Sequence, residues 1–113
     1  MKFKTEITWT FKKEFKRLNK RYPSLLNDIT EFRENLIANP ETGIDLGGGF
    51  RKIRMKITSK GKGKSGGARV ITFTIVVSVD ETEINLLYIY DKSERSSISK
   101  NELEEFLHLS GLK

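Results

Sequence analysis

Residues 50–77 read FRKIRMKITSKGKGKSGGARVITFTIVV, and this stretch decides the fold. Its first part alternates, which predicts a strand with one apolar face and one wholly cationic face. Residues 59–67 are rich in glycine and lysine and predict a flexible connection, while the β-branched run 69–77 is typical of a central strand. The two strands are therefore expected to be neighbours in a meander. The apolar positions are Ile53, Met55 and Ile57, and the cationic positions are Lys52, Arg54 and Lys56.

Upstream of this stretch the pattern predicts a strand and two helices. Residues 3–10 alternate with a period of two, as in a strand with one buried face, and Thr10 can cap the helix that follows. A second helix can begin at Pro23, where a missing N–H costs nothing, and ends before Gly43. Its apolar stripe is the clearest in the chain and comprises Leu25, Leu26, Ile29, Phe32, Leu36 and Ile37. The short join between the two helices predicts an antiparallel helical hairpin.

Downstream, one strand and one helix complete the domain. Residues 84–90 predict a largely apolar strand, and Ser99 can cap a last helix. With 113 residues the chain has room for one domain, which we expect to span residues 1–113. We expect an α+β fold in which an N-terminal strand and a helical hairpin pack on an antiparallel β-meander, followed by a short C-terminal helix.

The composition argues against several classes of protein. There is no cysteine and only one histidine, His108, so disulfides and a His/Cys zinc site are excluded, and we expect neither a metal nor a cofactor. We find no apolar run long enough to span a bilayer and no secretion signal, so we expect a cytoplasmic protein without a membrane partner. The Gly-Lys-Ser at residues 63–65 is not a nucleotide-binding P-loop, because the pattern needs a glycine where Thr58 stands.

Positive charge is concentrated in one window of the sequence. The formal net charge is +6, and residues 51–69 contain eight Lys or Arg and no Asp or Glu. Like charges without a local counter-charge indicate a surface for a polyanion. A second basic run, residues 12–21, is more typical of a solvated helix face.

The residues that could carry chemistry are cationic and phenolic, because carboxylate pairs, Ser-His arrangements and HExxH spacings are absent. Such a set suits metal-free cleavage of RNA, in which the ribose 2′-OH attacks the adjacent phosphate and cations stabilise the added charge. A lysine beside other cations can also take up a proton near neutral pH. Phosphate binding without chemistry is equally compatible with these residues. The meander should gather Lys52, Arg54, Arg69, Tyr90, Lys92 and Arg95, with Arg69 at the exposed end of its strand.

Several segments resemble the RelE superfamily of toxins, and most of all its HigB-type branch. They are NPETG at 39–43, FRKIR at 50–54, GKGKSGGARVI at 61–71, LLYIYDKSE at 86–94 and Ile98-Ser99. The resemblance covers residues 11–107 and implies the RelE-like microbial ribonuclease fold. It also implies a type II toxin that inhibits translation as a ribosome-dependent, metal-independent messenger-RNA endonuclease. The partners implied are a co-encoded antitoxin, expected to be a helix-turn-helix protein, and the 70S ribosome with its messenger; operator DNA would be reached only through the antitoxin.

Position by position, the resemblance implies a site. Lys52 and Arg54 match the basic pair on the second strand, and Arg69 matches the arginine that contacts the scissile phosphate; with Tyr90 and Lys92 they are the candidate catalytic residues. The candidates for RNA or ribosome binding are Arg51, Lys56, Lys60, Lys62, Lys64 and Arg95.

Two departures and two alternatives stay open. Ser93 and Ser99 stand where RelE has an arginine and a tyrosine, which leaves the general acid and base unassigned. Tyr90 is a candidate for that role, although a tyrosine on an apolar strand is more often a core residue. ParE-like toxins share this fold but inhibit DNA gyrase without nuclease activity. A non-catalytic RNA-binding module is the other alternative.

Overall fold

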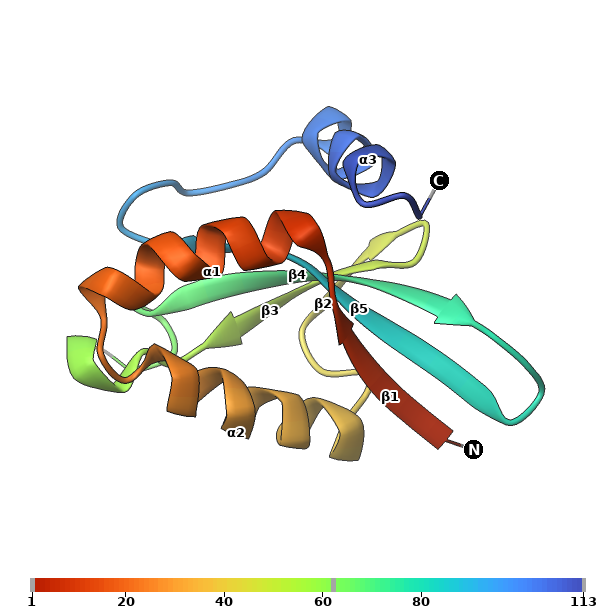
Figure 1. Ribbon diagram of the computed structural model, residues 1–113, viewed down its shortest axis with the longest axis horizontal. Coiled ribbons are helices and arrows are strands. Elements are labelled where there is room, and N and C mark those ends of the chain that lie inside the picture. Colours follow the sequence, from red (N-terminus) through yellow and green to blue (C-terminus); the bar gives the residue numbers. More distant parts are fainter. Residues whose placement is uncertain (1, 62, 113) are drawn as a thin grey trace.

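The computed structural model describes residues 2–61 and 63–112, and it confirms the expected α+β class (Figure 1). The elements in chain order are β1 (Lys2–Ile7), α1 (Trp9–Arg21), α2 (Leu25–Ala38), β2 (Ile44–Gly47), β3 (Phe50–Met55), the short 3-10 helix η1 (Thr58–Lys60), β4 (Ala68–Val76), β5 (Glu81–Asp91) and α3 (Lys100–Leu109). In this part of the chain no helix combines the length and apolar character needed to cross a bilayer.

The strands form one sheet in the order β1-β5-β4-β3-β2. Strands β2 to β5 pair antiparallel, as a meander requires, whereas β1 lies parallel to β5 at the edge. Because β1 pairs only with the first half of β5, up to Ile7 opposite Leu86, the second half has a free edge. The start of α1 lies against that edge: the hydroxyls of Thr8 and Thr10 donate to the Leu87 carbonyl oxygen at 3.1 and 2.5 Å.

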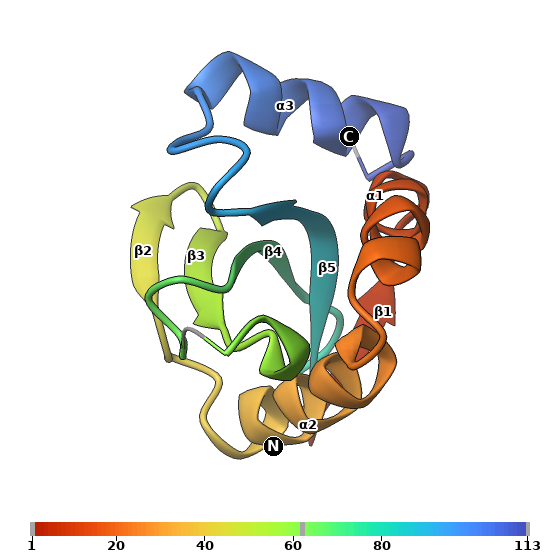
Figure 2. The same cartoon turned by 90° about the vertical axis from the view of Figure 1, so that its left-hand side faces the viewer.

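Helices cover both faces of the sheet, and two apolar cores result (Figure 2). The helical hairpin α1–α2 packs on the face that carries Ile53, Met55 and Val70. Helix α3 packs its Leu103 and Leu107 on the opposite face. The cationic side of β3 therefore belongs to the α3 face, because side chains alternate along a strand.

The N-terminal boundary differs from the sequence prediction. The first strand ends at Ile7, and Thr8 rather than Thr10 caps α1 by accepting a hydrogen bond from the Phe11 N–H. The reason is tertiary, since the Thr10 hydroxyl is used on β5. Trp9, expected on the strand, begins the helix instead and is 59% exposed.

Helix α2 also departs from the predicted pattern. It begins at Leu25, after Ser24, so that Pro23 lies outside it. Leu26 and Ile37, both placed on the apolar stripe, are 60% and 43% exposed. Each directly follows a buried leucine, and a rotation of about 100° per residue turns the second side chain of such a pair away from the sheet.

Strand β2 was not expected from the sequence. It pairs with β3 through a turn in which Gly47, Gly48 and Gly49 all have positive φ, at 85°, 62° and 92°. Side chains with a Cβ rarely adopt this conformation, so the three glycines allow a hairpin here. The sheet consequently has five strands, with β3 inside it rather than at the edge.

Candidate active site

Three adjacent strands place one residue each in a row across the α3 face of the sheet. Arg54 of β3 is the cross-strand partner of Arg69 of β4, and Arg69 is in turn the partner of Tyr90 of β5. Lys52 lies two residues before Arg54 and is opposite Ile71, so it shares this face. The fold thus brings together four of the five candidate catalytic residues.

The guanidinium of Arg69 is held by the loop before it. Arg69 is 6% exposed, so the expectation that it lies at an exposed strand end is wrong. Its Nη1 donates to the carbonyl oxygens of Lys64 and Ala68, both at 3.2 Å, and its Nη2 donates to the Ser65 carbonyl oxygen at 3.1 Å. Three of the five N–H groups are used, and the remaining Nε–H and Nη2–H have no partner in the described part of the chain. Those two groups form one edge of the guanidinium, which matches two phosphate oxygens.

Tyr90 closes the row as a buried and uncharged donor. It is 2% exposed, as a core residue would be, yet its hydroxyl has no hydrogen-bond partner among the described residues. The Arg95 guanidinium lies 5.8 Å from its ring centre. Burial raises the pKa of Tyr90, against the opposing effect of Arg69 and Arg95. The phenol is therefore protonated at neutral pH and can donate a hydrogen bond but not act as a base.

Three further candidate cations, Lys92, Lys56 and Lys64, are exposed outside the row. Lys92 follows β5 directly, and its backbone N–H donates to the Gly67 carbonyl oxygen at 3.0 Å while its side chain is exposed. Lys56 and Lys64 are exposed and line one small hollow with Arg54 and with Asp28 and Glu31 of α2. Lys62 lies outside the described residues.

Three of the candidate binding cations are committed to other groups. Lys60 is 11% exposed in its side chain, and its Nζ lies 2.6 Å from Asp91 Oδ1. Arg51 donates to carbonyl oxygens of the α2–β2 connection, at 2.6 Å for Glu41. Arg95 pairs with Glu102 at 2.7 Å. The structure therefore does not gather Lys60 and Arg51 with the row, whereas Arg95 lies over the ring of Tyr90 while it pairs with Glu102.

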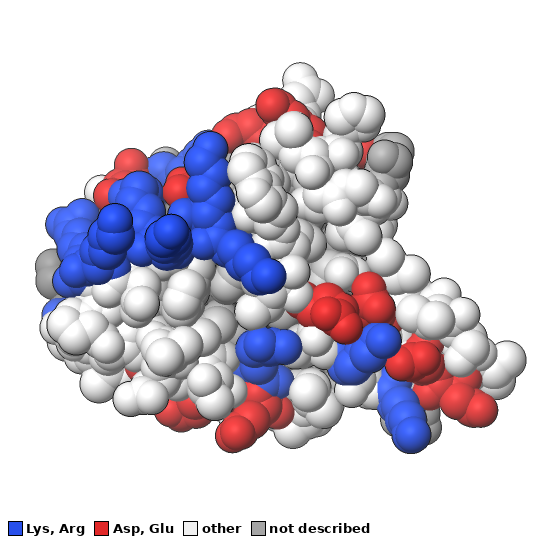
Figure 3. Space-filling view, viewed as in Figure 1, with Lys and Arg blue, Asp and Glu red and all other residues white. Residues whose placement is uncertain are grey.

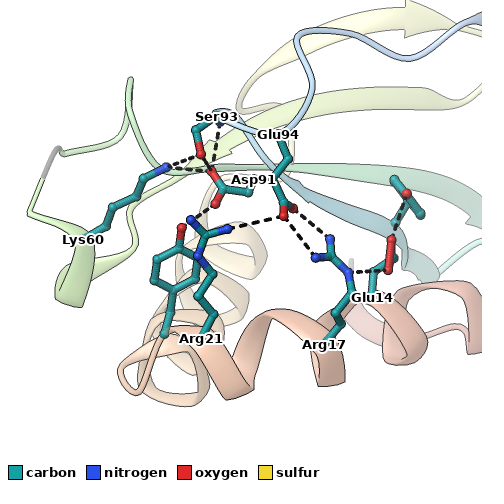
Figure 4. Close-up of polar contacts among 9 residues, drawn as sticks. Glu14, Arg17, Arg21, Lys60, Asp91, Ser93 and Glu94 are labelled. Atoms are coloured by element: carbon teal, nitrogen blue, oxygen red, sulfur yellow. Dashed lines mark hydrogen bonds and ion pairs between the residues drawn. The ribbon is translucent and has the colours of Figure 1, made fainter.

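Asp91 is the residue of this region that sequence reasoning missed (Figure 4). It is fully buried and accepts hydrogen bonds from Lys60 Nζ at 2.6 Å and from the Tyr22 hydroxyl at 2.5 Å. Ser93 adds its backbone N–H at 2.9 Å and its hydroxyl at 2.8 Å. Burial by itself disfavours the carboxylate, but the bond from Lys60 and the other donors outweigh it and hold the pKa of Asp91 well below its usual range.

The ion pair between Lys60 and Asp91 connects the basic loop, residues 59–67, to the rest of the fold. Lys60 lies at the start of the loop, Asp91 ends β5, and Tyr22 terminates α1, so one carboxylate joins three segments distant in sequence. The same loop supplies the carbonyl oxygens that orient Arg69. Asp91 and Lys60 therefore hold the loop that orients Arg69 and are themselves largely buried away from a substrate. An aspartate at the end of an apolar strand carries no sequence signal of that role.

Fold and site define a small α+β domain with a row of cationic side chains that ends at one buried phenol. A comparison with protein-family models matches residues 3–112 to the family described as RelE toxin of RelE / RelB toxin-antitoxin system. The match covers nearly the whole chain. The chain belongs to the RelE toxin family and is a toxin of a type II toxin-antitoxin system, for which the family implies a RelB-type antitoxin as partner.

Proposed function

We propose that this toxin inhibits translation by cutting messenger RNA on the 70S ribosome, without a metal ion, as toxins of its family typically do. The observation that carries the proposal is the cross-strand row of Arg54, Arg69 and Tyr90 with Lys52 beside it. Such a row offers fixed positive charge and one neutral donor to a single phosphodiester, which is what attack by the 2′-OH requires.

In the proposed reaction the ribose 2′-oxygen attacks the adjacent phosphorus, and the bond to the 5′-oxygen breaks. The products are a 2′,3′-cyclic phosphate and a new 5′-hydroxyl, and the 2′-OH proton is balanced by protonation of the 5′-oxygen. Arg69 would bind two phosphate oxygens through its free edge. Lys52 and Arg54 would stabilise the added negative charge, and Tyr90 would donate to an oxygen of the phosphorane. Lys92, at the end of β5, would add charge at the rim.

The surrounding cations would bind the RNA backbone outside the reacting phosphate. Lys56 and Lys64 are exposed beside Arg54 and are suited to this role, whereas Lys60 would act only by holding the loop. We further propose the HigB-type branch, on the strength of residues 50–54 and 61–71. A co-encoded helix-turn-helix antitoxin would neutralise the toxin and connect it to operator DNA. Action on ribosomes would take place in the cytoplasm.

The test is induction of the toxin in a bacterial host without its antitoxin, with 5′ ends of transcripts mapped before and after. New ends inside translated coding regions, absent with Arg69→Ala and present with Lys100→Ala, are the expected result; Lys100 is an exposed lysine at the start of α3. Circular dichroism of purified Arg69→Ala must show a folded protein. Intact messengers together with accumulated gyrase-DNA breaks would instead support the ParE-like alternative.

A further inference from the structure

Helix α1 carries a second cationic surface that the proposed reaction does not use. Figure 3 shows Lys and Arg side chains gathered in a dense band over this helix. Lys12, Lys13, Lys16 and Lys20 are exposed, and three of them recur at every fourth position, so they form one stripe along the helix. The four lysines lie on the side of α1 opposite its buried Phe11 and Leu18, so the stripe faces solvent and points away from the sheet that carries the cationic row.

The charges on this helix fall into two groups. Arg17 lies 2.8 Å from Glu94 and 3.3 Å from Glu14, and Arg21 lies 3.4 Å from Glu94, so the local carboxylates neutralise the arginines (Figure 4). The four lysines form no ion pair with any described residue. Like charges spaced four residues apart destabilise a helix, so the stripe is not explained by the stability of α1.

An exposed aromatic ring stands at the end of the same surface. Trp9 is the chain's single tryptophan, begins α1 and is 59% exposed. Lys13 Nζ lies 5.4 Å from its ring centre, which places a cation beside the ring. Exposed aromatic rings next to a line of cations are the combination with which proteins bind single-stranded nucleic acid, since bases stack on the ring and phosphates pair with the cations.

We propose that Trp9 and the lysine stripe, meaning Lys12, Lys13, Lys16 and Lys20, form a second RNA-binding surface. Trp9 stacks on an unpaired base, and the lysines bind the phosphates that follow it. The surface lies on the solvent side of α1 and the cationic row lies on the sheet, so the surface engages a different RNA segment from the one that is cut. It goes beyond the proposed function because it requires no cleavage.

The chemistry favours RNA over an acidic protein as the occupant. Protein interfaces centre on a cluster of apolar side chains, and Trp9 is the one large apolar side chain of α1 that is exposed among the described residues. Interfaces with nucleic acids are instead polar and strongly positive. The stripe and its single ring fit the second description.

The experiment uses a 12-nucleotide single-stranded RNA with 2′-O-methyl groups, which cannot undergo 2′-OH attack, so that binding is measured apart from cleavage. Because Trp9 is the only tryptophan, its fluorescence reports this surface alone. We expect saturable quenching by the single strand. In the triple variant Lys12→Ala, Lys16→Ala, Lys20→Ala, the slope of log affinity against log salt should become shallower by about 2, at about 0.7 per lost phosphate contact.

Two further variants complete the test, with a labelled oligonucleotide followed by anisotropy. Trp9→Ala should weaken binding at least about 5-fold through the lost stacking. The control Lys2→Ala, Lys100→Ala removes two exposed lysines outside α1 and should leave affinity and salt slope unchanged. The proposal is overturned if Trp9 fluorescence does not respond at saturation, if the triple variant keeps the wild-type slope, or if a polyglutamate peptide binds more tightly than the RNA. Failure here would leave messenger cleavage by the cationic row untouched, since cleavage is assayed separately.

Discussion

Replacing Lys60 by methionine tests whether the buried pair beneath the site is built as described. The change keeps the length of the side chain but removes the ammonium 2.6 Å from a carboxylate that is fully buried. Asp91 would retain only the neutral donors Tyr22 and Ser93. Removing one partner of a buried ion pair costs about 3–5 kcal/mol, and the 11% exposure of the Lys60 side chain places the expected cost near the lower end, about 3 kcal/mol.

This cost can be converted to a melting temperature. With an unfolding entropy of about 2.1 cal/mol/K per residue over 113 residues, a loss of about 3 kcal/mol lowers Tm by about 13 °C. Urea titration and thermal melting followed by circular dichroism measure both quantities. The matched control is Lys64→Met, an exposed lysine of the same loop without an ion pair among the described residues, which should change stability by less than about 0.5 kcal/mol.

A double variant separates lost charge pairing from lost packing. Lys60→Met with Asp91→Asn removes both charges, so no unpaired ion stays buried, and it should be more stable than Lys60→Met alone by at least about 1 kcal/mol. The reasoning is refuted if Lys60→Met is as stable as Lys64→Met. It also fails if the double variant is no more stable than the single one, because the cost would then not come from an unpaired carboxylate.

The other predictions concern pH, the row and the antitoxin. Because the pKa of Asp91 lies below its unfolded value of about 3.9, the pair stabilises the protein at neutral pH and this contribution disappears as pH falls below about 4; urea midpoints should drop more steeply in acid for the wild type than for Asp91→Asn. Arg69→Lys keeps the charge but loses the two-pronged edge, so cleavage on programmed ribosomes should slow at least about 10-fold, and an unchanged rate would contradict the proposed contact. Tyr90→Phe removes an unpartnered buried hydroxyl and should leave unfolding free energy within about 0.5 kcal/mol or raise it, while single-turnover cleavage slows; loss of stability without loss of rate would make Tyr90 a core residue only. Stopped-flow association with the antitoxin should slow as salt rises from about 0.05 to 0.5 M, where the Debye length falls from roughly 14 to 4 Å, and less so for Lys56→Ala, Lys64→Ala; equal salt dependence in both proteins would remove the basic loop from antitoxin capture.

The sequence alone predicts those features that depend on local periodicity. The alternation through Ile53, Met55 and Ile57 was enough to place these side chains in the core, where all three are less than 5% exposed. The same alternation put Lys52 and Arg54 on the other face, and a meander then made Arg69 and Tyr90 their neighbours. Period-two and helical patterns reflect local side-chain directions, so they can be predicted without knowing how distant parts of the chain pack.

Tertiary structure decided which charges are free. From the sequence, Lys60 and Lys64 are equivalent members of one basic loop, yet Lys60 is paired with a buried aspartate 31 residues away and Lys64 is exposed. The position of β1 beside β5 was also set by tertiary contacts, and with it the use of Thr10 on β5 in place of the helix cap. The physical reason is the same in each case. A pairing between residues far apart in the chain depends on which elements pack together in the folded protein. Neither composition nor periodicity contains that information.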